Sequence, residues 1–144
     1  FDTVIQNCAQ GRKDSNDTWI VDDMQQAYID LHAAGFAHSV EVWQGDELIG
    51  GLYGVSLGGA FFGESMFSRQ SNGSKIALAH LVAQLNEWGF GFIDSQVYSD
   101  HLGSLGAITI PRKEFIKRLD IETSKPTRMG PWQFSIEPFN TGIK

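Results

Sequence analysis

Apolar residues recur along this chain with two different periods, and each period predicts a different element. Met24, Ala27, Tyr28 and Leu31 follow one another at intervals of three or four, which predicts an amphipathic helix ending at Gly35. Asp22 and Gln25 have the spacing of a capping box at the start of this helix. Residues 1–21 are polar and weakly patterned, and 11–17 has the composition of a loop.

The following segment has the alternating pattern of strands. Residues 39–43 alternate between apolar and polar, and 44–46 has the composition of a turn. A second strand is predicted over 48–57, loosened by three glycines, and the glycine pair at 58–59 turns the chain into a third strand over 60–67. The three segments together predict an antiparallel meander.

Helical spacing returns after a polar loop at 68–73. Ser74 suits the N-cap of a helix that ends at Gly89. Its apolar side is predicted to hold Ile76, Leu78, Ala79, Leu81, Val82 and Leu85. Residues 90–97 are short and apolar, which is typical of a central strand.

The last third of the chain predicts two more helices and a tail. Ser99 can cap a short helix that runs through Leu105, and Pro111 can open a helix. The side chains expected to face inward from this last helix are Phe115, Ile116 and Leu119. From 120 to 144 we expect an extended tail anchored by Trp132 and Phe134.

Composition narrows the class of protein. With 42% hydrophobic and 19% charged residues in 144, the chain has the profile of one globular domain over 1–144. It has no apolar run of membrane-spanning length and no signal-peptide pattern, so we expect no membrane partner. Cys8 is the single cysteine and the four histidines lack ligand spacing, so no disulfide, no metal and a reducing cytoplasm are expected.

Charge is distributed unevenly along the chain. The net charge is −6, but residues 1–68 carry ten acids against two bases, whereas 69–144 carries seven acids against nine bases. Six of those bases fall between 112 and 128. Such a patch can hold a phosphate backbone, and it can equally be the solvated face of a helix.

Three polar residues in apolar surroundings are candidates for chemistry. Glu64 follows two phenylalanines, and Asp94 and Gln96 are two apart on a predicted strand, so their side chains should point the same way. A buried carboxylate is costly unless it is paired or used. These residues therefore predict a polar centre in an apolar pocket, although Glu64 could lie on a solvent face and Asp94 could cap a turn.

Several longer motifs carry a resemblance to a known family. They are the segments 38–43, 50–54, 63–69, 93–97, 101–106 and 110–112. In this order and spacing they resemble bacterial leucyl/phenylalanyl-tRNA–protein transferases, over about 19 to 119. The resemblance implies an α+β, GNAT-like N-acyltransferase fold, and the predicted order of a meander followed by helix, strand and helix agrees with it by analogy.

The resemblance also implies an activity. Members of this family transfer leucine or phenylalanine from aminoacyl-tRNA to the N-terminal arginine or lysine of acceptor proteins, which marks those proteins for degradation, and they use no cofactor. Residue by residue, it places Gln96 beside the attacking amine, Asp94 as the group that orients it, and Glu64 as a pocket carboxylate that holds an ammonium group or a water. A monomeric, cytoplasmic enzyme is expected.

The same resemblance assigns the substrate contacts. It places the donor side chain among Leu52, Phe61, Met66, Leu81 and Ile93, and Leu78 belongs to the same predicted apolar walls. Trp43 matches a residue that would stack on the terminal adenosine. Taken singly, each of these residues also fits an ordinary core position. The expected contacts with the tRNA backbone are Arg112, Lys113, Lys117 and Arg118.

Two features depart from what the resemblance implies. Strand alternation puts Ile93 on the face opposite Asp94, so both can serve one site only if the strand bulges or splays. The family also has an N-terminal domain that this chain lacks, so a fragment and a natural short form both fit. A non-catalytic module that binds aminoacyl-tRNA ends or peptide N-termini is therefore one alternative. A coenzyme A–dependent acetyltransferase is the other, disfavoured because the loop 69–75 has only one glycine with which to cradle a pyrophosphate.

Overall fold

The computed structural model describes residues 1–10 and 20–136, and the loop predicted over 11–17 lies outside them. Within these two ranges, four strands form one mixed sheet in the order β1-β2-β3-β4. The strands are β1 (Ala37–Gln44), β2 (Glu47–Leu57), β3 (Ala60–Ser68) and β4 (Phe92–Asp94). The first three pair in antiparallel fashion and β4 pairs with β3 in parallel, so the α+β class and the meander are confirmed.

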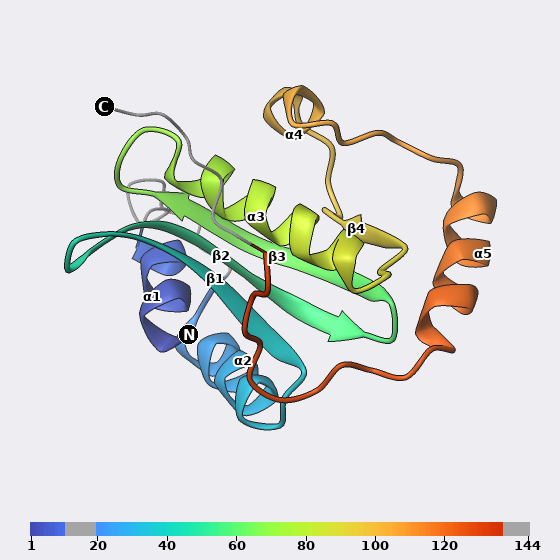
Figure 1. The fold of residues 1–144 in the computed structure, drawn as a ribbon, viewed down its shortest axis with the longest axis horizontal. Coiled ribbons are helices and arrows are strands. Elements are labelled where there is room, and N and C mark those ends of the chain that lie inside the picture. The colour runs from blue at the N-terminus through green and yellow to red at the C-terminus, as the bar shows by residue number, and fades with distance from the viewer. Residues whose placement is uncertain (11–19, 137–144) are drawn as a thin grey trace.

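Helices cover both faces of this sheet (Figure 1). In the described residues they are α1 (Asp2–Gln10), α2 (Asp22–Ala33), α3 (Gly73–Glu87), α4 (Asp100–Ser104) and α5 (Arg112–Thr123). Helices α1 and α2 lie against one face and α3 against the other, while α5 stands at the edge of the molecule beyond β4.

Each face of the sheet has its own hydrophobic core. On the α1 side the buried residues are Val4, Ile5, Cys8, Ala9, Ile20, Leu48, Tyr53 and Phe67. On the α3 side they are Val40, Leu52, Phe61, Ala77, Leu81 and Leu85. Because alternate residues of β2 serve opposite cores, as Leu52 and Tyr53 do, this strand is buried on both faces and holds the layers together.

Several local predictions were wrong. Helix α1 was not predicted, although its buried Val4, Ile5 and Cys8 have helical spacing. The capping box at α2 is absent, because the N-cap is Val21 and the Gln25 side chain donates to the Ile20 carbonyl instead.

Helix α3 also begins two residues earlier than predicted, at Gly73. Its N-cap is Asn72, in the left-handed region at φ 70°, and Ser74 instead lies inside the helix. The Ser74 backbone N–H donates to the Ser68 hydroxyl at 2.8 Å, which ties the helix start to the end of β3. By contrast, the predicted cap of α4 is confirmed, since the Ser99 hydroxyl accepts from the Leu102 backbone N–H.

Burial on α3 and α5 differs from the predicted inner faces. Val82 and Ala79 are exposed, and the buried residues of α3 include Gln84. On α5, Phe115 and Leu119 are half-buried but Ile116 is exposed. Instead, α5 is fixed by Glu122, whose backbone carbonyl accepts the Gly59 N–H at 2.9 Å. A Cβ atom at Gly58 or Gly91 would collide with Glu122, which explains why glycines stand there.

The C-terminal segment returns across the sheet after α5. It runs past α2 and over β1, where the Gly130 N–H donates to the Gly35 carbonyl (Figure 1). The predicted anchoring is confirmed, because Trp132 and Phe134 pack on the α3-side core. The tail predicted from 120 begins later, because α5 continues to Thr123, and its last part, 137–144, lies outside the described residues. The Trp132 ring stacks on His38 with 3.8 Å between ring centroids.

Candidate active site

The candidate site is a cavity of about 460 Å³ beside the place where β3 and β4 separate. Its walls combine apolar side chains with a carboxylate, an amide and several hydroxyls. The lining residues are Leu52, Tyr53, Phe61, Gly63, Glu64, Ser65, Met66, Leu78, Leu81, Ile93, Ser95, Gln96, Val97, Ser99, His101 and Leu102. Such a cavity can enclose an apolar group while polar atoms act on a bond at its edge.

The cavity exists because β4 is short. β3 and β4 pair only from Ala60–Phe92 to Phe62–Asp94, whereas β3 continues to Ser68. Beyond Phe62, β3 therefore has an open edge on this side within the described part of the chain. The prediction of a central strand over 90–97 was wrong, because β4 has three residues and lies at the edge of the sheet.

Glu64 is directed by a β-bulge. Tyr53 pairs with Ser65 and Gly54 pairs with Gly63, so Glu64 is the extra residue between them. A bulge turns the side chain away from strict alternation and is common beside functional sites. As a result the half-buried Glu64 lines the cavity from the middle of the open edge of β3.

Tyr28, from α2, lies against Glu64. Burial, followed by hydrogen bonding to Glu64 and by its charge, raises the pKa of the Tyr28 hydroxyl above its usual range. The hydroxyl therefore stays protonated and can donate to the carboxylate. Sequence reasoning assigned Tyr28 only to the apolar side of its helix, since nothing in the local pattern shows that α2 approaches β3.

Gln96 reaches the cavity through a tight turn rather than by strand alternation. The Asp94 carboxylate accepts the Gln96 backbone N–H at 2.8 Å, and Gln96 has a φ of 63°. This left-handed conformation is uncommon for a residue other than glycine and is costly unless its surroundings fix it. The Gln96 amide donates to the Gly63 carbonyl at 3.2 Å, which spans the separation between the two strands.

This turn resolves the conflict between Ile93 and Asp94. Ile93 and Gln96 line the cavity, whereas Asp94 does not. The prediction that Asp94 and Gln96 point the same way from one strand was wrong, because the strand ends at Asp94. Through its hydrogen bond with the Gln96 backbone N–H, the Asp94 carboxylate instead stabilises the turn that directs Gln96 into the cavity.

The structure brings together eight of the ten residues predicted for the catalytic and pocket positions. Six are apolar, namely Leu52, Phe61, Met66, Leu78, Leu81 and Ile93, and two are polar, namely Glu64 and Gln96. Trp43 lies elsewhere, on β1, with 52% of its surface exposed and its indole N–H donating to Glu41.

Several lining residues were not predicted. Ser65 is buried, and its hydroxyl has no hydrogen-bond partner among the described residues. His101 is exposed and lines the cavity. It belongs to the motif at 101–106 that carries part of the resemblance, but no role was predicted for it. Neither residue has a pattern that sets it apart, because both reach the cavity only through the bulge in β3 and the fold of α4 over α3.

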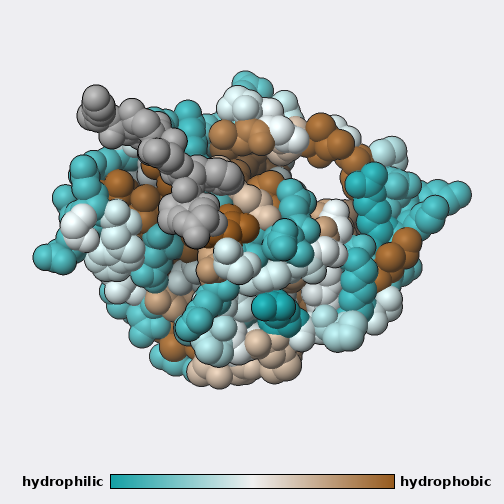
Figure 2. Space-filling view, in the orientation of Figure 1, coloured by the Kyte–Doolittle hydropathy of each residue, from teal (hydrophilic) through white to brown (hydrophobic). Residues whose placement is uncertain are grey.

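A second cavity of about 290 Å³ adjoins the first and shares Leu78, Ile93, Ser95 and Leu102 with it. Its other walls come from α3, β4 and the segment that follows α4. Hydrophobic surface, brown in Figure 2, gathers over α4 and along the segment that leads to α5. Residues of α4 line both cavities, and the segment that follows it lines the second.

The four predicted backbone-binding bases lie on α5, apart from the cavity. Arg112, Lys113, Lys117 and Arg118 are all exposed. Arg118 also pairs with Glu114 at 2.9 Å, and Lys125 pairs with Glu122 at 2.6 Å. The positive surface available to an anion is therefore smaller than the count of bases suggests.

The described residues hold neither a metal-binding cluster nor a membrane-spanning helix. No group of three or more His, Cys, Asp or Glu side chains there could hold a metal ion. No helix within 1–10 and 20–136 is both long and apolar enough to cross a membrane.

Comparison with known proteins gives one consistent result. A family model described as leucyl/phenylalanyl-tRNA protein transferase matches residues 1–120. The leucyl/phenylalanyl-tRNA–protein transferase of Hahella chejuensis is 54% identical over 138 residues, which are 96% of this chain and 58% of that protein. The enzyme of the same name from Nitrosospira multiformis is 56% identical over 137 residues, 95% of this chain and 59% of its own length. The chain thus spans less than two thirds of these relatives.

Proposed function

Since the chain belongs to the leucyl/phenylalanyl-tRNA protein transferase family, we propose that it forms the catalytic domain of an enzyme that moves leucine or phenylalanine from aminoacyl-tRNA to proteins. The acceptors are proteins with an N-terminal arginine or lysine, which the transfer marks for degradation. The domain adopts a GNAT-like fold and acts as a cytoplasmic monomer. The observation that carries the proposal is one cavity that joins six predicted pocket residues to Glu64 and Gln96.

The apolar part of the cavity suits the donor side chain. Leu52, Phe61 and Leu81 are almost fully buried, so this part of the wall is fixed by the core of the protein. A leucine or phenylalanine side chain gains roughly 1.5–3 kcal/mol when it is fully removed from water. The ester carbonyl would then lie toward the polar edge formed by Glu64 and Gln96.

The reaction needs alignment more than strong base catalysis. The donor is an activated ester, and a free α-amine has a pKa of roughly 7.7–8.0, so a useful neutral fraction exists near pH 7. Because the Gln96 amide nitrogen donates to Gly63, its amide oxygen can accept from the attacking amine. Holding the amine beside the ester carbonyl supplies the main rate gain. As the new C–N bond forms, the ester C–O bond to the 3′-oxygen of the tRNA breaks, and the proton lost by the amine passes through water or a neighbouring acceptor to that departing oxygen.

Glu64 would bind a positively charged or polar group at the same edge of the cavity. A half-buried carboxylate supported by the Tyr28 hydroxyl suits an ammonium group or an ordered water near the reacting carbonyl. Asp94 acts through the Gln96 turn and is therefore a positioning residue. No cofactor is needed, because the aminoacyl ester is already activated for acyl transfer.

Transfer of label from leucyl-tRNA to a peptide with N-terminal arginine tests the proposal, with the whole natural protein in the assay. We expect label on the peptide and no acetylation of it by acetyl-coenzyme A. If label stayed on the tRNA while acetyl-coenzyme A modified the peptide, the acetyltransferase alternative would replace this proposal. Binding of leucyl-tRNA without transfer would favour the non-catalytic module.

Variants at the turn separate its two roles. Gln96→Ala should lower turnover by about 10² or more, the scale expected for the loss of a positioning group. Asp94→Ala should lower it similarly, whereas Asp94→Asn, whose amide oxygen can still accept the Gln96 N–H, should retain much more activity. Glycine adopts the left-handed region without steric cost, so Gln96→Gly should not destabilise the turn. Loss of activity at unchanged or higher stability would show that the reaction needs the Gln96 side chain.

A further inference from the structure

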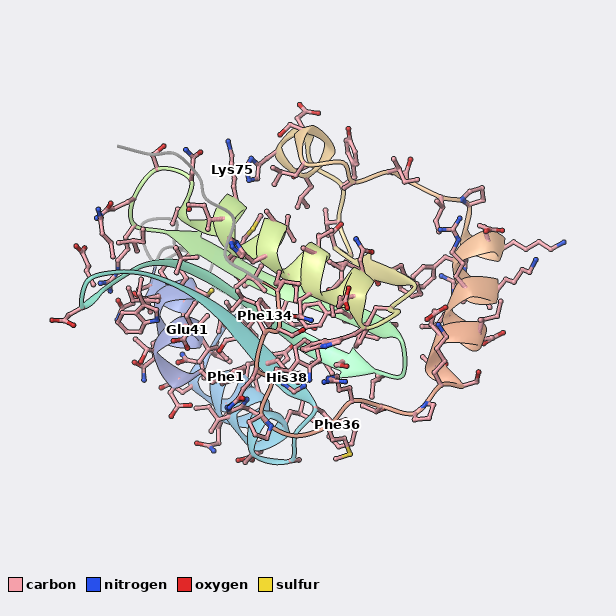
Figure 3. All side chains as sticks on the ribbon, in the orientation of Figure 1. Phe1, Phe36, His38, Glu41, Lys75 and Phe134 are labelled. Carbon is pink, nitrogen blue, oxygen red and sulfur yellow. The ribbon has the colours of Figure 1, made fainter. Side chains whose placement is uncertain are left out.

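The residues 127–136 form a strap behind the candidate donor pocket, outside the segment 1–120 that matches the family. The strap contacts the rest of the protein at several separate points. The Gly58 N–H donates to the Thr127 hydroxyl at 2.9 Å, and the Arg128 guanidinium lies 4.2 Å from the Trp88 ring centroid. Figure 3 shows Phe134 and His38 along its course over the sheet.

The far end of the strap is held by Gln84, which is fully buried in α3. The Gln84 amide oxygen accepts the backbone N–H of Ser135 at 2.6 Å and that of Ile136 at 3.2 Å. Its amide nitrogen donates to the Ser135 hydroxyl at 3.1 Å. Gln84 lies one helical turn after Leu81, so the residue that anchors the strap and a residue that lines the cavity share one helix face.

Trp132 fills the space between the strap and the pocket wall. Its ring lies 3.8 Å from His38, 5.0 Å from Trp88 and 5.9 Å from Phe61, as measured between ring centroids. Phe61 is 1% exposed and lines the cavity, whereas Trp132 does not line it. Trp132 therefore stands directly behind one wall of the pocket, with its own position fixed by the anchors on either side.

We propose that Trp132 is a positioning residue that sets the depth of the donor side-chain pocket by holding Phe61 in place from behind. The proposal rests on the proposed function for the identity of the donor. With the Trp132 ring shortened, Phe61 can retreat toward the strap and the pocket deepens. Leucine then loses more contact than phenylalanine, because the longer ring can follow the retreating wall.

Selectivity between two donors tests this in the whole natural protein. For Trp132→Leu, kcat/KM for leucyl-tRNA should fall about fivefold to tenfold more than for phenylalanyl-tRNA. Trp132→Phe should restore much of the original ratio. Two matched controls should leave the ratio unchanged even where they lower stability. They are Thr127→Val, which removes the hydroxyl that accepts from the Gly58 N–H, and Met129→Ala, at an exposed strap residue.

A double variant shows whether the effect passes through Phe61. If it does, Phe61→Leu/Trp132→Leu should have the same donor ratio as Phe61→Leu alone. Additive changes in the ratio, or an unchanged ratio in a folded Trp132→Leu, would overturn the proposal.

Equilibrium binding of leucyl and phenylalanyl amides of 3′-amino-adenosine gives the same ratio without catalysis. If the protein bound both compounds but transferred neither leucine nor phenylalanine from aminoacyl-tRNA, the proposed function would fall. The change that Trp132→Leu makes in the ratio of the two dissociation constants would still test the role of Trp132. A wild-type protein that bound neither compound would overturn both.

Discussion

Lowering the pH from 7 to 5 should destabilise the folded protein through His38. This side chain is 3% exposed and stacks on Trp132, and its Nε2 atom has no hydrogen-bond partner among the described residues. Burial lowers the pKa of His38 from 6.5 to about 4, helped by the charge of His32 and opposed by a backbone hydrogen bond with Gly35. The folded state thus excludes a proton that the unfolded chain binds readily.

The sign and the size of the effect follow from this pKa difference. Between pH 6.5 and 4 the unfolded chain binds more protons than the folded one, so the free energy of unfolding falls as the pH is lowered. The contribution is nearly absent at pH 7 and amounts to a loss of about 2 kcal/mol at pH 5. It is about 3 kcal/mol at pH 4 and approaches its limit of about 3.4 kcal/mol at lower pH.

Urea unfolding followed by tryptophan fluorescence at pH 7, 6, 5.5 and 5 measures the effect. His38→Phe keeps a ring against Trp132 but cannot be protonated, so its stability should fall about 2 kcal/mol less than that of the wild type over this range. His101→Gln, at an exposed position, should follow the wild type. Parallel pH curves for wild type and His38→Phe, or a His38 NMR signal that titrates near 6.5, would refute the reasoning.

Three further outcomes are expected. Gly58→Ala should cost about 1–3 kcal/mol of stability in urea unfolding, because Gly58 has a φ of 57° and the new methyl group collides with the Glu122 backbone carbonyl, whereas Gly63→Ala meets only the Asp94 carbonyl at 3.6 Å and should cost less. Leu81→Phe should penalise phenylalanyl-tRNA more than leucyl-tRNA by roughly 1–3 kcal/mol in kcat/KM, and equal effects would place Leu81 in the ordinary core. Replacing Arg112, Lys113, Lys117 and Arg118 with Ala should weaken tRNA binding and flatten its salt dependence, in which each phosphate contact contributes about −0.7 to −0.9 to the slope, while binding of phenylalanyl-adenosine stays the same. Wild-type salt dependence in that quadruple variant would reduce the patch to a solvated helix face.

Periodicity predicted most of the longer helices and strands. The meander and helices α2 and α3 were confirmed because their apolar spacing is regular over many residues. It failed where tertiary contacts decide burial. Helix α1 buries Val4, Ile5 and Cys8 within a mostly polar sequence, and Ile116 is exposed because α5 is fixed by Glu122 rather than by a continuous apolar face.

The candidate site was predicted in its residues but not in its geometry. The types and order of Glu64, Asp94 and Gln96 drew attention to them, but alternation gave the wrong relation between Asp94 and Gln96. A left-handed residue other than glycine, stabilised by a hydrogen bond to its own turn, leaves no signature in a single sequence. The contact of Tyr28 with Glu64 likewise depends on how α2 packs against the sheet.

The open edge of β3 has a consequence for self-association. An unpaired strand edge is a template onto which another chain can add a strand, and this one runs beside an apolar cavity. Glu64 stands in the middle of that edge, and its bulge breaks the regular spacing of backbone donors and acceptors. A second copy that paired there would have to bury a carboxylate and match an irregular ladder. The same bulge that turns Glu64 toward the cavity therefore disfavours edge-to-edge aggregation. Deleting Glu64 would remove both the bulge and the carboxylate, and this protection would be lost with them.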